Sequence, residues 1–151
     1  MEAKLILHPT DGSESADKAL DYAAQLAVGS NAKLLVLYVQ ALHGTDNVPP
    51  ALAEFARVEN IHLTEADVLR EAAEALVAKV ENAARAKGVR DVETITMTGD
   101  PAHVILDVAK DRKVDTIVMG SRGLGSLQGL LLGAVAYKVA HMAPCTSIIV
   151  R

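Results

Sequence analysis

Short apolar runs alternate along this chain with longer segments whose apolar residues recur at helical spacing. This alternation constrains the fold more than any other feature of the sequence. Short continuous apolar runs are typical of strands that are covered on both faces. Strands that alternate with helices form a parallel sheet with right-handed crossovers. The predicted strands are residues 5–7, 34–39, 92–98, 116–119 and 147–150.

The third of these strands differs from the others. Ile95 and Met97 alternate with threonines, a pattern that favours a sheet edge with one wet face. With this strand at the edge, the expected strand order is 3-2-1-4-5. The sequence therefore predicts one α/β domain over residues 1–151: a doubly wound, Rossmann-like, five-stranded parallel sheet with helices on both faces. A chain of this length buries about 70% of its unfolded surface, which is enough for a real core.

Residues that favour turns and caps mark the expected ends of the elements. Residues 9–12 (Pro-Thr-Asp-Gly) are a strong turn signal after the first strand. Ser13 or Ser15 can cap the helix that follows, and Gly29 is expected to end it. The Asp-Pro pair at residues 100–101 predicts an N-cap and the first residue of a later helix.

The amino-acid composition argues against several classes of function for this chain. The chain has 15 basic and 19 acidic residues and a net charge of -4, without a stretch that concentrates Lys and Arg. Only 3% of the residues are aromatic, so both the charge and the stacking surfaces for nucleic acid are missing. The longest apolar stretch, residues 130–136, is far shorter than the roughly 20 residues of a membrane span. With one cysteine, Cys145, and no apolar leader, a cytoplasmic location is expected.

The strand order predicts where a ligand binds. In a doubly wound sheet, ligands lie beyond the carboxyl ends of the strands at which the order reverses. Here the reversal falls between strands one and four, so residues 9–11 face the loop that begins at Gly120. Glycines at 120, 123 and 125 leave N–H groups uncovered before a helix predicted over residues 127–142, which suits a phosphate. Gly133 inside that helix costs about 1 kcal/mol relative to alanine, and a close approach by a ligand or another backbone would explain it.

Taken alone, the glycines are equally well explained by a bare turn. They do not form a Walker loop, because the sequence has no Gly-Lys-Ser/Thr. They also follow the fourth strand, whereas the dinucleotide Gly-x-Gly-x-x-Gly follows the first.

The spacing Gly120-x2-Gly123-x9-Gly133 resembles the nucleotide-binding signature of the universal stress protein family. Other segments resemble the family in the same order along nearly the whole chain. They are residues 11–13 (Asp-Gly-Ser), 99–101 (Gly-Asp-Pro), 115–123 and 143–145 (Ala-Pro-Cys). Several separated motifs in the right order are far more specific than the glycines alone.

The resemblance implies a stress-response protein that forms a homodimer through its last strand and binds ATP or AMP, with or without Mg²⁺. By position, the adenosine would be bordered by Pro9, Thr10 and Asp11, and the adenine edge would contact the Val39 backbone. The ribose and phosphates would be surrounded by Met119, Gly120, Arg122 and Gly123. The phosphate site would be closed by Gly133, Ala134, Val135 and Ala136.

The chain departs from the family pattern after the third glycine. The family places Ser or Thr there, and this chain has Ala134; Ala136 also lacks a hydroxyl that relatives often carry. A hydrogen bond to a charged group contributes about 1.5–3 kcal/mol, so one lost bond weakens binding roughly ten- to hundred-fold. ATP is therefore expected to gain little over AMP.

Other functions remain open at this stage. A family member that binds no nucleotide and acts through protein contacts is one alternative, and a slow ATPase is another. We expect no enzyme and no metal site, because the sequence lacks a nucleophile elbow and its five histidines lack ligand spacing. A flavin protein is disfavoured by the scarcity of aromatic residues. Asp11 has its own alternative, since it could simply brace the turn.

Overall fold

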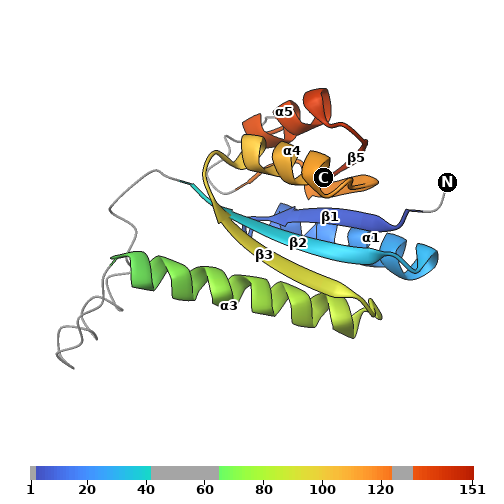
Figure 1. The fold of residues 1–151 in the computed structure, drawn as a ribbon, viewed down its shortest axis with the longest axis horizontal. Helices are drawn as coiled ribbons and strands as arrows, with labels where there is room; N and C mark the ends of the chain where they lie inside the picture. The colour runs from blue at the N-terminus through green and yellow to red at the C-terminus, as the bar shows by residue number, and fades with distance from the viewer. Residues whose placement is uncertain (1–2, 42–64, 124–130) are drawn as a thin grey trace.

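The computed structural model describes residues 3–41, 65–123 and 131–151. Its strands form one parallel sheet in the order β3-β2-β1-β4-β5 (Figure 1). The predicted fold class and strand order are confirmed. The strands are β1 (Leu5–Thr10), β2 (Lys33–Gln40), β3 (Val92–Thr98), β4 (Thr116–Gly120) and β5 (Thr146–Val150).

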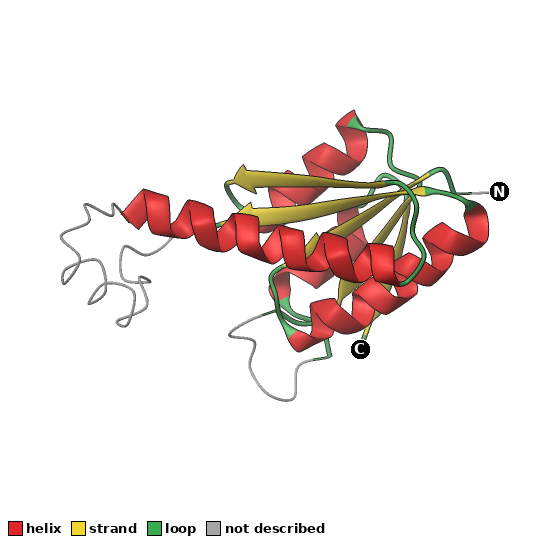
Figure 2. Cartoon of the chain, turned by 90° about the horizontal axis from the view of Figure 1, so that it is seen from below, coloured by secondary structure: helices red, strands yellow, loops and turns green. Residues whose placement is uncertain are grey.

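Helices cover both faces of this sheet. The helices α1 (Glu14–Ser30) and α3 (Glu65–Ala86) lie on one face, and α4 (Pro101–Asp111) and α5 (Ala134–Met142) lie on the other (Figures 1 and 2). Because side chains alternate along a strand, neighbouring residues enter opposite layers. Ile6 joins the core beneath α1 and α3, whereas Leu7 joins the core beneath α4 and α5. None of the helices described is long and apolar enough to cross a membrane.

The first helix begins as predicted but ends later. Ser13 is its N-cap and accepts a hydrogen bond from the Ala16 N–H, at 3.2 Å. The predicted stop at Gly29 is wrong, because the helix continues to Ser30 and Asn31 takes the left-handed conformation (φ 50°). Asparagine tolerates that conformation well enough to end a helix, so glycine is not required here.

Two further expected boundaries are corrected. The first strand was expected to end before Pro9, but β1 runs to Thr10 and pairs with β2 throughout. Proline is tolerated because only Ile6 and Leu7 of β1 pair with β4. Beyond Leu7, the missing N–H of Pro9 therefore breaks no ladder with β4.

The last helix starts at Ala134, so the predicted start near residue 127 is wrong; residues 124–130, with Gly125, lie outside the described residues. Gly133 is the N-cap of α5 in an extended conformation, and its N–H donates to the Ser121 carbonyl at 2.6 Å. Leu131, expected on the buried face of a helix, is 67% exposed. The cost of a glycine inside a helix therefore does not arise at Gly133.

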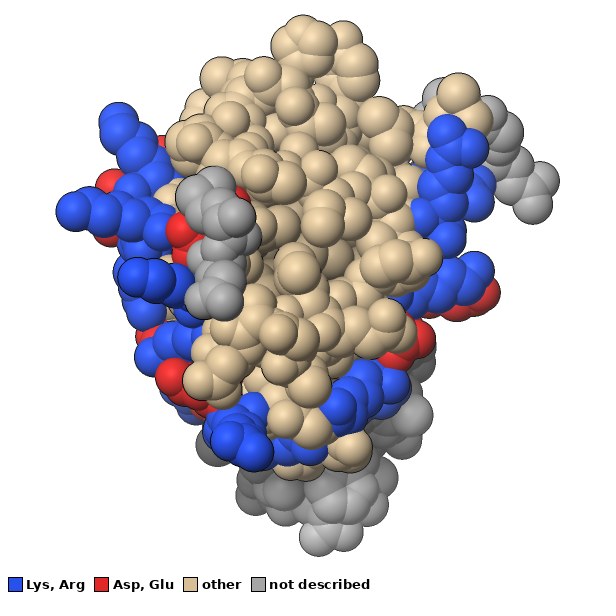
Figure 3. Space-filling view, turned by 90° about the vertical axis from the view of Figure 1, so that its right-hand side faces the viewer, with Lys and Arg blue, Asp and Glu red and all other residues tan. Residues whose placement is uncertain are grey.

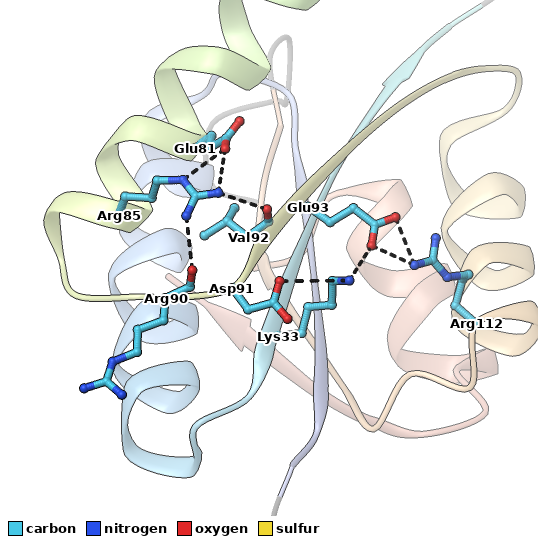
Figure 4. A network of polar contacts seen from close by, with 8 residues as sticks. All are labelled: Lys33, Glu81, Arg85, Arg90, Asp91, Val92, Glu93 and Arg112. Carbon is cyan, nitrogen blue, oxygen red and sulfur yellow. Dashed lines mark hydrogen bonds and ion pairs between the residues drawn. The ribbon is translucent and has the colours of Figure 1, made fainter.

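A polar network fastens the amino ends of two strands, on the side away from the predicted site (Figure 4). Glu93 on β3 accepts from Lys33 on β2 at 2.9 Å and from Arg112, just after α4, at 2.9 Å. Hydrogen bonds from Lys33 and then Arg112 hold the pKa of Glu93 below its usual value. Arg85 on α3 donates to the carbonyl oxygens of Arg90 and Val92.

Figure 3 shows one face of the molecule, on which Lys and Arg lie around the left, right and lower margins with Asp and Glu among them. A broad area without charged side chains fills the centre of this face, so no basic stripe of the kind that follows a nucleic-acid backbone crosses it.

Candidate functional site

A cavity of about 570 Å³ opens at the carboxyl ends of the strands. This volume is within the usual range for small-molecule sites. All twelve residues predicted from the sequence line it. Pro9 and Thr10 end β1 and Asp11 follows; Val39 lies on β2; Met119 and Gly120 end β4; Arg122 and Gly123 begin the loop; Gly133, Ala134, Val135 and Ala136 form the start of α5.

The cavity lies between β1 and β4 because these two strands separate there. Their ladder ends at Leu7, although β1 continues to Thr10. Past that point, the His8 side chain bridges the strands: its Nδ1 donates to the Val118 carbonyl at 2.9 Å. His8 is fully buried, and burial lowers the pKa of its imidazole below the ordinary 6.5. The imidazole is therefore neutral at pH 7.

One wall of the cavity is apolar. Leu37 and Val39 come from β2, Met119 from β4 and Ile105 from α4. Such a wall suits the face of a planar base, with backbone groups left to read its edge. Sequence reasoning predicted Val39 and Met119 here but missed Ile105 and Pro101 of α4. The signal for them was indirect: α4 begins where β3 ends, and all parallel strands end at this side of the sheet.

Asp11 contributes a charged side chain to the lining. Its Oδ1 accepts the Ser13 N–H at 2.9 Å, so the turn-bracing role is observed. A side chain on Gly123 would overlap with Oδ2 of the same carboxylate. The described start of the glycine loop, residues 121–123, thus lies close to the turn after β1, and a larger residue at position 123 would require the Asp11 side chain to move.

Gly120 is needed for a different contact. A Cβ on this residue would lie 2.7 Å from the Ser15 carbonyl carbon and 2.9 Å from the Ala16 nitrogen. Real Cβ atoms essentially never come so close to backbone atoms. The end of β4 is therefore pressed onto the first turn of α1, a packing reason for glycine that the sequence did not indicate.

The start of α5 supplies donors to this cavity. Gly133 offers no side chain to cap the helix, and no capping hydrogen bond from the described residues replaces it. The first N–H groups of a helix have no partner within the helix, and the helix dipole adds a partial positive charge there. Residues 134–136 line the cavity, so their end of α5 suits an anion such as a phosphate.

No group of three or more His, Cys, Asp or Glu residues that could hold a metal ion occurs within residues 3–41, 65–123 and 131–151. Among the described lining residues, Asp11 is the only carboxylate, and none is a histidine.

Comparison with known proteins gives one consistent family. The sequence profile of the universal stress protein family matches residues 2–151. Universal stress protein YxiE of Bacillus subtilis is 38% identical over 149 residues, covering 93% of this chain and 94% of the relative. The structure of universal stress protein UspA from Lactobacillus plantarum is 26% identical, with a TM-score of 0.77 and coverage of 100% and 99%. A universal stress protein solved in complex with cAMP is 26% identical, with a TM-score of 0.73 and the same coverage.

Proposed function

This chain belongs to the universal stress protein family, and we propose that it works by binding an adenine nucleotide in the crevice between β1 and β4. The observation that carries the proposal is the meeting in one cavity of apolar side chains, a glycine loop and a helix start that no side chain of the described residues caps. The complex of a 26% identical relative with cAMP supports the same class of ligand.

In the proposed complex, adenine lies against the apolar wall of Val39, Met119 and Ile105. Its edge meets the backbone of Val39, at the end of β2. The ribose lies near Thr10 and Asp11, and the phosphates meet the N–H groups of residues 134–136 with the Arg122 side chain nearby. Base and phosphate thus bind to opposite ends of the same cavity.

The proposed ligand is AMP or ATP, with little gain for the longer tail. Ala134 and Ala136 offer backbone N–H groups but no hydroxyl to the phosphates. Each missing donor to a charged oxygen removes about 1.5–3 kcal/mol of the affinity that a hydroxyl would add. A Mg²⁺ ion brought by ATP would find one carboxylate, Asp11, among the described lining residues. Binding is therefore expected to depend weakly on Mg²⁺.

We propose a binding protein rather than an enzyme. Hydrolysis of ATP needs a group that orients or deprotonates the attacking water. Asp11 is the one candidate base among the described lining residues, and it is already engaged with the Ser13 N–H. A slow ATPase and a family member that acts only through protein contacts are the alternative functions. The cytoplasmic location is part of the same proposal and rests on the single cysteine.

We further propose that two copies pair through β5. In the described part of the chain, β5 has a neighbouring strand on one side only, and Ile148 and Ile149 are half-buried. A free strand edge without proline invites antiparallel pairing with a second copy.

The first test is to denature the purified protein and identify any released nucleotide by chromatography. Titration of nucleotide-free protein with AMP, ATP and FMN, each with and without Mg²⁺, then follows by calorimetry. We expect AMP and ATP to bind with similar affinity and FMN not to bind. Absence of both AMP and ATP binding would favour the member that acts through protein contacts alone.

The paired variants Ala134→Asp and Ala134→Asn test the phosphate seat. An acidic residue in the first turn favours the helix, so Ala134→Asp leaves α5 intact. Two like charges at about 4 Å repel by roughly 1–4 kcal/mol between water and a protein surface, so AMP affinity should fall by about fivefold or more. Ala134→Asn has the same size without the charge and should bind AMP more tightly than Ala134→Asp does. Equal affinity for AMP in both variants would place the phosphate elsewhere.

A further inference from the structure

Ser15, in the first turn of α1, contacts two segments that lie far away in the sequence. Its Oγ accepts the Arg122 N–H at 3.4 Å, in the glycine loop. The same hydroxyl donates to the Val150 carbonyl at 3.5 Å, at the end of β5. A hydroxyl has one donor and two acceptor positions, so both contacts can form at once. Both are long for hydrogen bonds, which sets a modest scale for the effect of each.

Ser121 fastens the base of the same loop. Its N–H donates to the Val150 carbonyl at 2.7 Å, and its carbonyl accepts the Gly133 N–H at 2.6 Å. Ser121 is 2% exposed, so both of its backbone groups are used inside the protein. Ser121, just after β4, is therefore bonded both to Gly133 at the start of α5 and to Val150 at the end of β5.

Close packing adds to these bonds. A Cβ on Gly120 would come 2.5 Å from the Ser15 Oγ, so the hydroxyl fills the space beside the last residue of β4. Ser15 does not line the cavity, whereas Gly120, Ser121 and Arg122 do. The hydroxyl lies behind the loop rather than inside the crevice.

We propose that Ser15 is a positioning residue for the glycine loop: it sets the Arg122 backbone, and with it the phosphate end of the crevice, without touching the ligand. This inference deepens the proposed function and rests on it for the identity of the ligand. Because the base lies against a wall that Ser15 does not hold, the loss of its hydroxyl weakens binding of a phosphorylated nucleoside and spares the nucleoside alone.

The variant Ser15→Ala tests this inference, with Ser30→Ala as its control. Ser30 is the last residue of the same helix. Among the described residues, its hydroxyl donates only to the Leu26 carbonyl, at 2.6 Å. By calorimetry, Ser15→Ala should bind AMP roughly three- to tenfold more weakly than wild type, which is the effect of about one ordinary hydrogen bond because both contacts of Ser15 are long. Its affinity for adenosine should change less than about twofold. Ser30→Ala should leave both affinities as in wild type.

A second measurement needs no nucleotide. Amide hydrogen exchange by NMR in the nucleotide-free protein should be faster at Ser121, Arg122 and Gly133 in Ser15→Ala than in Ser30→Ala. Unchanged exchange at these amides, or an equal loss of adenosine and AMP affinity, overturns the positioning role. If wild type binds neither ligand while exchange still rises in Ser15→Ala, the proposed function fails and the positioning role stands.

Discussion

His8 lies on the central strand β1, and its side chain replaces a backbone N–H as the hydrogen-bond donor to β4. Beyond Leu7, β1 no longer pairs with β4, and the His8 Nδ1 donates to the Val118 carbonyl. Because a carbonyl only accepts, Nδ1 carries the proton and Nε2 does not. Nε2 is buried and has no hydrogen-bond partner among the described residues. A second proton would therefore have to enter a fully buried ring.

Stability should consequently depend on pH through His8. Burial lowers the pKa of folded His8 below 6.5, the value expected in the unfolded chain. Below about pH 6.5 the unfolded state binds a proton that the folded state does not. The free energy of unfolding should then fall as the pH falls toward the folded pKa, by at most about 1.4 kcal/mol per pH unit.

His8→Asn isolates this effect, because an asparagine amide nitrogen can replace Nδ1 as a donor but does not titrate. Urea unfolding of both proteins between pH 5 and 8 provides the measurement. The difference between the two curves cancels the other four histidines, which both proteins share. Parallel curves would show that His8 does not become protonated on unfolding.

Among the elements, α1 shows how a helix end is decided. Gly29 looked like the stop, but the carbonyl oxygens of Ala27 and Val28 are met by the Asn31 N–H, one turn later. Apart from its chain neighbours and the nearby backbone of α1 itself, no atom of the described residues lies within 4 Å of a Cβ placed on Gly29. Because β2 begins at Lys33, the chain must turn just before that residue, and Asn31 makes the turn.

Substitution of Asn31 should separate backbone conformation from side-chain chemistry. Asn31→Ala places an ordinary residue in the left-handed region and should lower the free energy of unfolding by about 1 kcal/mol. Asn31→Gly adopts the same conformation freely and should be neutral or stabilising. Thermal and urea unfolding of both variants provide the check. Equal losses in the two variants would mean that the asparagine side chain, rather than its φ of 50°, is what matters.

The start of α5 and the end of β1 were missed for a related reason. Residues 130–136 continue the apolar spacing of a helix, so periodicity alone cannot place its first residue. The bond from the Gly133 N–H to Ser121 fixes that start, and it joins residues 12 positions apart. Likewise, Pro9 predicts the end of a strand. It is tolerated here because β4 has already separated from β1 at that position.

At the scale of the whole molecule, the sheet has two edges of different character. On β3, residues 96–98 are exposed, and α3 lies alongside the strand (Figure 1). On β5, Ile148 packs into the core under α1 and Ile149 into the core under α4 and α5. The proposed self-association therefore concerns β5 and not β3.

One added charge on each edge tests this assignment. Ser147→Lys places a lysine on β5 without removing a core side chain, and lysines at an edge oppose strand pairing. Light scattering should report a dimer for wild type and for the control Thr96→Lys on β3, and a monomer for Ser147→Lys. Circular dichroism should be alike in all three proteins. A wild-type monomer at micromolar concentration, or dissociation by Thr96→Lys alone, would contradict pairing through β5.

The sequence by itself determined the parallel sheet and its strand order, because hydrophobic periodicity and caps are local properties and the order of strands then dictates which ends meet. The twelve predicted residues around the crevice came from the resemblance of its motifs to the universal stress protein family. Only the tertiary structure explained why position 120 requires glycine, because a Cβ there would meet the backbone of α1; it also showed that Gly123 faces the Asp11 side chain. It also decided the roles of His8 and Ser15, whose partners lie more than 100 residues away along the chain. A hydrogen bond or a close contact across that separation leaves no pattern in the neighbouring residues, so it becomes visible only when the strands are side by side.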